Sequence, residues 1–530
     1  MRRAGTSRLT PAQCLELMVE RRELLKAAFG ALTVAVVPGA QARAQGAASD
    51  DVMPFSRDGL LARARELAKK PHAPVTATPQ EFFSTLTREQ YESMEMKPEA
   101  LIWASENKSF YVEPLLRGWV YGAPVDLYVA DGGTAAKQRF AAARYGLGDP
   151  KLAERLPDPG FSGFRVLPAA SAVKEREAAA IAQFQGASFF RAKAPGQGKW
   201  GVAARGLSIR TADPQGEEFP TFQNFWIEKP AAGDNTLIIH ALLDSPSVVG
   251  VYRFTLRAAA EATILDTELT LFPRVELDHV GIASLAGASF FTPLDRRRVD
   301  DVRVCASEMN GLQILTGKDE WLWRPLSNRN SLQYSSFVDA NPKGFGFLTR
   351  IRDLGAYQDD KEHWERRPSV WIEPLGDWGE GAVQLVEIPS ESEFNQNIIA
   401  YWRPKQRLSN TREASFAYRQ FWSWEPPTRP PLATVADARS GRGAAPKHRR
   451  FIVVFRGDVL SDASRPAAAS ALVTSPGSAT ILHDAFDAVT KTHRVVFDLD
   501  PGAESYCELR LVLKAGEEQI SETWLYRWTL

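Results

Sequence analysis

The sequence predicts a mostly β protein, made of a large N-terminal β-sandwich and a smaller C-terminal β-sandwich. Apolar and polar residues alternate with period two in residues 236–243, 248–256 and 263–272, which is typical of strands with one buried face. Turns rich in Pro, Gly and Ser separate these runs, with no amphipathic helices between them, so an α/β sheet is disfavoured. At 44% hydrophobic and 24% charged, the 530-residue chain has the composition of a globular protein.

Helices are expected mainly before the first strands. Residues 56–70 predict one helix, because a serine can cap its start and a proline follows its end. Residues 87–94 predict a second, opened by Thr87 with Gln90 three residues later, the spacing of a capping box. Residues 134–146 predict a third.

The first 44 residues read as an export signal and not as part of the fold. A basic start is followed by an apolar run, Ala27–Val37, and by small residues that end at Ala44. Eleven apolar residues are too few to span a bilayer. The pair Arg21-Arg22 directly before the run matches the twin-arginine export pattern. We therefore expect a periplasmic protein.

Charge and motifs exclude several classes of protein. Basic and acidic residues both number 64, and without residues 1–44 they number 57 and 61, a net charge of −4. No basic footprint for nucleic acid exists. The three cysteines, of which Cys305 and Cys507 lie beyond the signal, are too few for a disulfide scaffold, and their pairing is left open. Phosphate-loop, zinc-protease and nucleophile-elbow motifs are absent, so we expect no cofactor and no metal.

The domain boundary is expected in residues 425–450, which are rich in Pro, Gly, Ala and basic residues, as connectors are. Residues 45–424 then form the large sandwich. Short strands at 451–455, 494–499, 506–514 and 520–528 would build an immunoglobulin-like domain over residues 451–530.

Tryptophan is concentrated in one stretch. Eight of the 14 Trp residues lie between Trp321 and Trp424, and carboxylates are interleaved with them. Flat rings stack on sugar C–H groups while carboxylates bind hydroxyls, so the stretch is compatible with a carbohydrate cleft. Large β-sandwiches also use Trp to fill their cores, and the pattern alone leaves both readings open.

A set of motifs, taken together and in order, resembles the bacterial periplasmic glucans biosynthesis proteins of the G and D type. The motifs are Gly160-Phe-Ser-Gly-Phe-Arg165, Gly186-Ala-Ser-Phe-Phe-Arg191, Ala204-Arg-Gly-Leu207, Glu217-Glu-Phe-Pro220, Phe225-Trp226, Leu243-Asp-Ser-Pro246, Asn341-Pro-Lys-Gly-Phe-Gly346, Tyr357-Gln-Asp359, Arg367-Pro-Ser-Val-Trp-Ile-Glu-Pro374, Val386-Glu-Ile-Pro389 and Ser521-Glu-Thr-Trp-Leu-Tyr526. The resemblance covers nearly the whole chain after the signal. The twin-arginine-like signal is more similar to that of the D type.

The resemblance implies a galactose-mutarotase-like N-terminal sandwich, an immunoglobulin-like C-terminal domain and a role in osmoregulated periplasmic glucan biosynthesis. It implies processing of a β-1,2-linked glucan backbone by an inverting hydrolase or a transglycosylase. Alignment between Glu387-Ile-Pro389 and Tyr401-Trp402 puts Gln396 at the position of the family's general acid. A gapless alignment from Glu320-Trp321 back to Arg296-Arg297-Arg298 puts Glu308 at that of the general base.

Gln396 departs from the family pattern. A side-chain amide has no proton to give near neutral pH, so Gln396 cannot act as a general acid. The acid is then a displaced group such as Glu391 or Glu393, or the reaction differs, or the site only binds glucan.

Two hypotheses follow. One is an exported enzyme that processes β-glucan, and the other is a glucan-binding or assembly factor that has lost the acid. Contact with a membrane complex that makes glucan would be peripheral. In either case the expected substrate-binding residues are Tyr357, Asp359, Arg367, Trp371, Glu373, Trp378 and Trp402.

Overall fold

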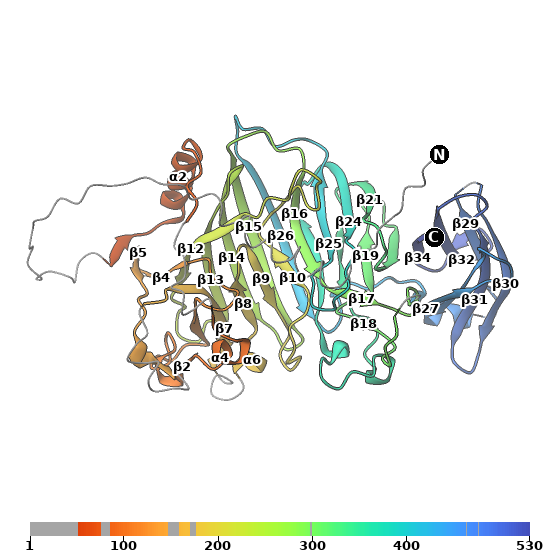
Figure 1. Cartoon of the computed structure of the whole chain (residues 1–530), viewed down its shortest axis with the longest axis horizontal. Helices are drawn as coiled ribbons and strands as arrows, with labels where there is room; N and C mark the ends of the chain where they lie inside the picture. Colours follow the sequence, from red (N-terminus) through yellow and green to blue (C-terminus); the bar gives the residue numbers. More distant parts are fainter. Residues whose placement is uncertain are drawn as a thin grey trace, which may run out of the picture. The chain divides into compact units, whose positions relative to one another are not determined.

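The computed structural model describes residues 51–75, 85–146, 158–169, 176–296, 299–462, 464–474 and 476–530. The predicted export signal lies outside these residues. The twin-arginine pair and the predicted similarity to the D-type signal therefore lie outside them as well. Residues 51–530 form one compact unit. Within it most of the regular structure is strand, which confirms the mostly β prediction (Figure 1).

Two large sheets face each other in the N-terminal domain. The first is the main part of a 16-stranded sheet. In spatial order its N-terminal strands are β1 (Val52–Pro54), β5 (Thr134–Lys137), β4 (Asp126–Asp131), β12 (Thr221–Glu228), β13 (Thr236–Asp244), β14 (Val248–Ala258), β15 (Ala262–Pro273), β26 (Ala414–Ser423), β23 (Ser369–Leu375), β22 (Gly344–Leu348), β19 (Gly311–Leu315) and β20 (Trp321–Pro325).

The second sheet has ten strands. Its order is β21 (Gln333–Ala340), β24 (Glu380–Glu387), β25 (Ile398–Pro404), β16 (Val280–Gly287), β10 (Ala203–Arg205), β9 (Phe189–Ala192), β8 (Ala182–Gln185), β7 (Phe161–Pro168) and β3 (Phe110–Leu116), with β11 (Ser208–Ile209) also on β16. Two small ribbons pair β17 (Ser289–Phe291) with β18 (Ala306–Ser307), and β2 (Glu95–Met96) with β6 (Tyr145–Gly146).

The core lies between the two sheets and follows the predicted alternation. On β15, Leu265, Leu269 and Leu271 are buried, while Asp266 and Glu268 alternate with them on the other face. The strands predicted at 236–243, 248–256 and 263–272 are confirmed as the antiparallel β13, β14 and β15. Because successive side chains of a strand point to opposite faces, a one-residue slip would bury the carboxylates.

The described helices are few and short. They are α2 (Arg57–Ala68), α4 (Arg88–Glu92) and α6 (Arg176–Ala179), with the 3-10 turns η1 (Pro98–Ala100), η2 (Ala142–Arg144), η4 (Leu354–Ala356), η5 (Trp364–Arg366) and η6 (Asp458–Ser461). The longest of them, α2, packs against β13, β14 and β15 of the large sheet. The caps at Ser56 and at Thr87 with Gln90 form as predicted. The helix predicted over 134–146 is wrong. That segment begins as β5, because its alternating residues pair with β4 and β1.

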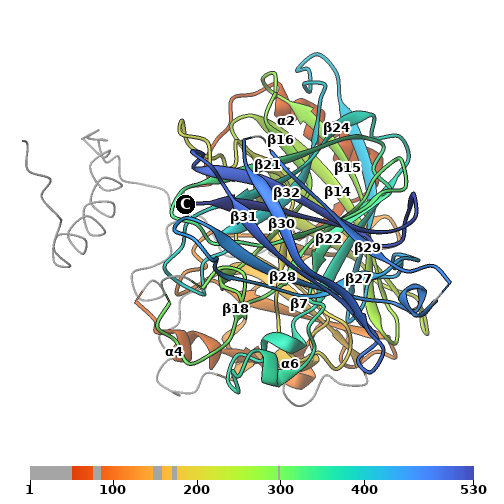
Figure 2. The ribbon, with the colours of Figure 1, turned by 90° about the vertical axis from the view of Figure 1, so that its right-hand side faces the viewer.

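The C-terminal domain is a small sandwich, as predicted. One sheet has four strands in the order β27 (Thr434–Arg442), β28 (Arg449–Arg456), β31 (Thr492–Asp500) and β30 (Ser478–Asp487) (Figure 2). The other contains β34 (Thr523–Thr529), β32 (Tyr506–Ala515), β29 (Ala468–Val473) and β33 (Glu518–Gln519). β27 lies inside the segment predicted as a connector, so the C-terminal domain begins earlier than residue 451. Cys305 and Cys507 are both free thiols.

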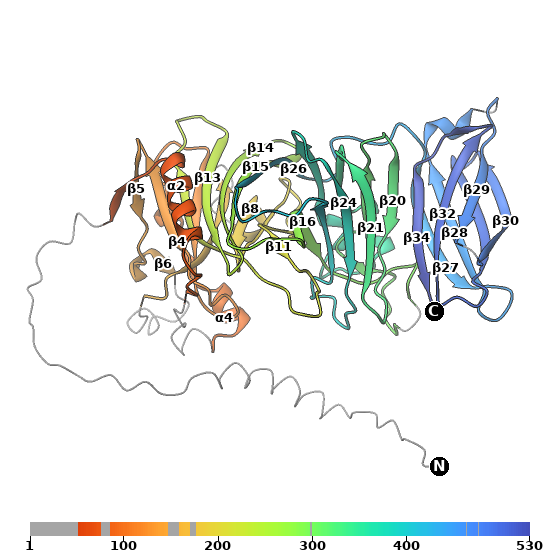
Figure 3. The same cartoon turned by 90° about the horizontal axis from the view of Figure 1, so that it is seen from above.

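The two domains share a sheet. β34 pairs in parallel with β20 through Leu322 with Thr523 and Trp323 with Trp524, so the 16-stranded sheet runs from one domain into the other (Figure 3). Among the described residues no helix is long and apolar enough to cross a membrane.

Candidate functional site

A polar loop cluster lies at one end of the ten-stranded sheet, where β16 ends and β25 begins. Both predicted positions, Glu308 and Gln396, lie on its loops. The Glu308 carboxylate accepts a hydrogen bond of 3.0 Å from the backbone amide of Ala288. Asn397, next to Gln396, holds the neighbouring residue Ser289 by accepting from its amide at 2.9 Å and donating to its carbonyl at 3.1 Å. Two segments far apart in the sequence therefore meet at residues 288–289.

Arg367 connects Glu308 to the loop before β23. Its Nη1 lies 3.3 Å from Glu308 Oε1, and its Nη2 lies 2.9 Å from Glu362 Oε2. The guanidinium also donates to the carbonyl of Trp200 and lies 4.7 Å from the ring centroid of Trp364. Side-chain exposures of 12% for Glu308 and 20% for Glu362 leave both carboxylates within reach of solvent.

A second arginine, Arg303, gathers three carboxylates in the same region. It pairs with Asp301 at 2.8 Å, Asp359 at 2.7 Å and Glu393 at 2.5 Å. Planar guanidinium groups bind several oxygens at fixed angles, so Arg303 fixes these loops relative to one another. No sequence motif marked Arg303 or Glu362. Only the folded chain shows that they lie beside the predicted residues.

Asp359 is an ionised acceptor at the centre of its loop. It accepts hydrogen bonds from Trp364 Nε1 at 2.8 Å, the Glu362 amide at 2.9 Å and the Lys361 amide at 3.2 Å, besides pairing with Arg303. Burial by itself would raise its pKa, but these donors outweigh burial and lower the pKa of Asp359 to about 2. Such a group holds the loop in place and does not carry a proton at neutral pH.

We expect Asp359 to make folding sensitive to acid. Its folded pKa lies below the unfolded value, so its contribution is full above the unfolded pKa and is lost as the pH falls towards about 2. The contribution is about 2 kcal/mol. In urea unfolding, Asp359→Asn should have a lower free energy of unfolding than the wild type at pH 7. The two values should converge as the pH falls to 2.5. Asp360→Asn, at an exposed neighbour, is the control, and equal pH profiles for the two variants would contradict the assignment.

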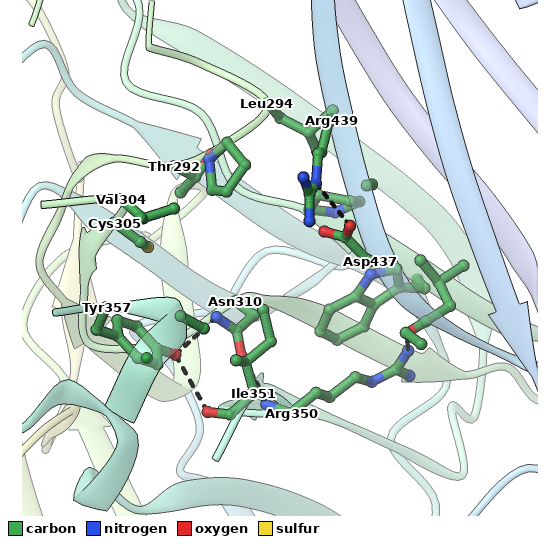
Figure 4. A pocket seen from close by; sticks show the side chains of 18 residues that line it. Thr292, Leu294, Val304, Cys305, Asn310, Arg350, Ile351, Tyr357, Asp437 and Arg439 are labelled. Carbon is green, nitrogen blue, oxygen red and sulfur yellow. Dashed lines mark hydrogen bonds and ion pairs between the residues drawn. The ribbon is translucent and has the colours of Figure 1, made fainter. Parts of the chain in front are cut away.

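Tyr357 lies at the boundary with the C-terminal domain. Its hydroxyl accepts from Asn310 Nδ2 at 3.0 Å and donates to the Ile351 carbonyl at 3.3 Å. It borders a cavity of about 330 Å³, lined mostly by apolar residues of both domains (Figure 4). The ring is fully buried, and burial raises the pKa of its hydroxyl. Tyr357 therefore packs behind the loop cluster and is not on its exposed surface.

The four remaining predicted residues lie elsewhere. Trp378 and Trp402 belong to the core between the sheets, with exposures of 5% and 0%. On β23, Val370 and Ile372 face that core, so Trp371 and Glu373 point to the opposite face of the large sheet. There Trp371 stacks on Trp321 and is 1% exposed. None of the three Trp rings has a free face for a sugar in this structure.

The outer face of the ten-stranded sheet leads towards the loop cluster and carries residues that the sequence did not predict to bind substrate. Phe190 and Ala204 face the core, so their neighbours Phe189 and Arg205 point outwards. Arg205 lies 5.1 Å from the Phe189 ring centroid and pairs with Glu217 at 2.6 Å. Beside the turn at Gly186, three partly exposed aromatic rings form a group, namely Tyr91, Trp119 and Tyr121.

A large cavity borders the loop that carries Gln396. It measures about 940 Å³ and is lined by Phe290, Asn328, Ser390 and the exposed Glu391, among others. An aromatic ring together with amide and carboxylate groups suits a neutral ligand rich in hydroxyls. Among the described residues, no group of three or more His, Cys, Asp or Glu side chains could hold a metal ion.

Fold and site together define a two-domain β protein with a polar, carboxylate-bearing loop cluster at the end of its large sandwich. The chain belongs to the family described as "Periplasmic glucan biosynthesis protein, MdoG", whose model matches residues 55–528. Membership of the family gives this chain a role in periplasmic glucan biosynthesis.

Several relatives carry the name "Glucans biosynthesis protein G". One from Vibrio cholerae is 38% identical over 90% of this chain and 87% of its own. One from Bradyrhizobium diazoefficiens is 37% identical over 96% of this chain and 100% of its own. Among solved structures, a GH36 α-galactosidase from Geobacillus stearothermophilus aligns with 41% of this chain and 30% of its own, at 8% identity and a TM-score of 0.23.

Proposed function

We propose that the protein binds β-1,2-linked glucan backbones along the outer face of the ten-stranded sheet and processes them at the loop cluster, by hydrolysis or by transfer. The observation that carries the proposal is the meeting of the Glu308 and Gln396 segments on residues 288–289. Positions expected to act on the same glycosidic bond have to lie on one side of the fold. The carboxylates around them supply the groups that glycoside chemistry needs.

Glu308 is the proposed general base. One of its oxygens is held by the Ala288 amide and the other by Arg367, which fixes the direction of the carboxylate. In an inverting mechanism the base removes a proton from water as the oxygen of that water attacks the sugar. The general acid has to come from a group other than Gln396. Glu391, which lines the 940 Å³ cavity, is better exposed for this role than Glu393, which pairs with Arg303.

Gln396 favours a second candidate, a glucan-binding or assembly factor without catalytic activity. An amide still donates to and accepts from sugar hydroxyls, so Gln396 suits binding as well as a carboxyl would. Under this alternative the same surface holds the glucan backbone and no bond is cleaved.

Incubation with linear β-1,2-glucan, followed by separation of the products, distinguishes the two candidates. If the protein is an enzyme, Glu308→Gln should lower the rate by about 10²- to 10⁴-fold, the usual contribution of a general base. Gln396→Asp should raise the rate of chain shortening, because it supplies a titratable group at the acid position. Glu261→Gln, at an exposed turn between β14 and β15, is the control and should leave the rate of glucan processing unchanged.

Absence of shortening or transfer alongside measurable glucan binding would leave the binding factor as the function. Absence of binding as well would overturn both candidates.

The export route is part of the same proposal. Arg21-Arg22 before the apolar run supports delivery through the twin-arginine pathway. Contact with a membrane complex that makes glucan would then be peripheral, through the exported domains.

A further inference from the structure

A carboxylate of the C-terminal domain is buried at the boundary with the N-terminal domain. Glu522, directly before β34, is 0% exposed. Its two oxygens accept from Arg350 Nη1 at 2.6 Å and Nη2 at 2.8 Å, which is a bidentate pair. They also accept from the Val435 amide at 2.7 Å and from Gln313 Nε2 at 3.1 Å.

Several further contacts hold the Arg350 side chain in place. Besides pairing with Glu522, its guanidinium donates to the Val435 carbonyl at 3.1 Å and lies 3.5 Å from the ring centroid of Trp323. Burial of such a pair costs desolvation, and apolar side chains of the same size often stabilise a fold equally well. An apolar pair, however, would not fix the orientation of the side chain at position 350. The bidentate geometry gives Arg350 one orientation.

The backbone of Arg350 continues the connection into the loop cluster. The amides of Arg350 and Ile351 both donate to Asn310 Oδ1, at 2.7 and 2.9 Å. Asn310 in turn holds the Tyr357 hydroxyl, as the dashed lines in Figure 4 show.

Both ends of this connection lie beside proposed site residues. Asn310 is two residues from Glu308, whose carbonyl accepts from Thr349 Oγ1 at 2.9 Å. Tyr357 is two residues from Asp359. A displacement of the backbone at Arg350 would therefore disturb the segments that carry Glu308 and Asp359.

We infer that Glu522 is a positioning residue through which the C-terminal domain fixes the geometry of the glucan site. Through Arg350 and Asn310 it holds the Glu308 and Asp359 segments in one arrangement. The C-terminal domain thus acts on the site of the N-terminal domain through this connection. The expected effect on glucan binding rests on the proposed function. The connection from Glu522 through Arg350 to Asn310 does not depend on it.

The test compares two carboxylates at the same domain boundary in the full chain. Glu522→Gln removes the charge that orients Arg350. Glu320→Gln removes a charge that joins the domains through Arg510 at 2.5 Å and Thr523 at 2.8 Å, without contact to Asn310. Well below the melting temperature, Glu522→Gln should weaken binding of linear β-1,2-glucan about tenfold, and Glu320→Gln less than about twofold. Equal losses for the two variants would overturn the inference.

Amide hydrogen exchange gives a readout that needs no glucan. In Glu522→Gln the amides of Arg350 and Ile351 should exchange about tenfold faster, while those of the central strand β14 stay protected. Unchanged exchange at both amides would refute the connection. A wild-type protein that binds no glucan would instead refute the proposed function and leave the exchange comparison valid.

If Glu522→Gln does not fold, the double variant Arg350→Met with Glu522→Gln removes both charges and avoids an unpaired buried ion. It should show the same faster exchange at Ile351. Wild-type exchange there would count against the inference.

Discussion

Glu387→Ala is expected to lower the free energy of unfolding by about 3–5 kcal/mol, because it leaves the buried Arg324 guanidinium without its carboxylate partner. Glu387 ends β24, and its side chain is 1% exposed. It pairs with Arg324 at 3.0 Å. It also accepts hydrogen bonds from the backbone amide of Ser327 at 2.7 Å and from the Ser327 hydroxyl at 3.0 Å. Denaturant unfolding monitored by tryptophan fluorescence measures the loss.

The control for Glu387 lies at the other end of the same strand. Glu380 begins β24 and pairs with Lys405 at 2.7 Å, with both side chains about 70% exposed. Solvent screens such a pair, so Glu380→Ala should leave the unfolding midpoint unchanged within error. A loss of similar size in both variants would mean that burial does not set the cost.

Trp402→Ala should cost about 3–5 kcal/mol, the range for a large aromatic side chain removed from a packed core. The ring is 0% exposed and lies 6.1 Å from that of Trp378. It also packs so closely on Gly381 that a Cβ there would lie 2.4 Å from the indole. Thermal and denaturant unfolding measure the effect, and Trp402→Phe should recover part of it.

The same variant tests the reading of Trp402 as a sugar platform. A core residue affects glucan binding only by unfolding the protein, so the fraction that remains folded should bind normally. Trp119→Ala is the opposite case, because its ring is partly exposed beside Tyr121 on the proposed glucan face. It should weaken glucan binding with little change in unfolding. If folded Trp402→Ala instead bound glucan weakly while Trp119→Ala bound it normally, Trp402 would again be a candidate for stacking on sugar.

Strand patterns were predictable from the sequence because they are local. The alternation on β15 is set by one buried and one solvated face, and it is read directly from neighbouring residues. The same local reading failed over 134–146, where pairing with strands β1 and β4 overrides helix propensity. The cap at Thr87 succeeded because it needs only Gln90, three residues away.

The tryptophan cluster shows where composition stops being informative. Trp371 lies only 7 and 31 positions from Trp378 and Trp402 in the sequence, yet it stacks on Trp321 at the outer face of the large sheet while the other two rings lie in the core between the sheets. Whether a ring fills a core or faces a ligand depends on what covers it, and the covering strands come from elsewhere in the chain. The carboxylates of the loop cluster have the same property. Asp301 and Asp359 lie close together because both pair with Arg303.

By itself the sequence determined that this chain is mostly β and resembles the periplasmic glucan biosynthesis family, and it predicts Gln396 at the position of the family's acid. Those conclusions rest on local periodicity and on motifs in order, which folding does not change. Only the tertiary structure decided that Glu308 and the Gln396 loop meet at residues 288–289, and that Glu522 reaches Arg350 from the other domain. Contacts between residues tens to hundreds of positions apart depend on how the sheets pair, and no short stretch of sequence encodes that pairing.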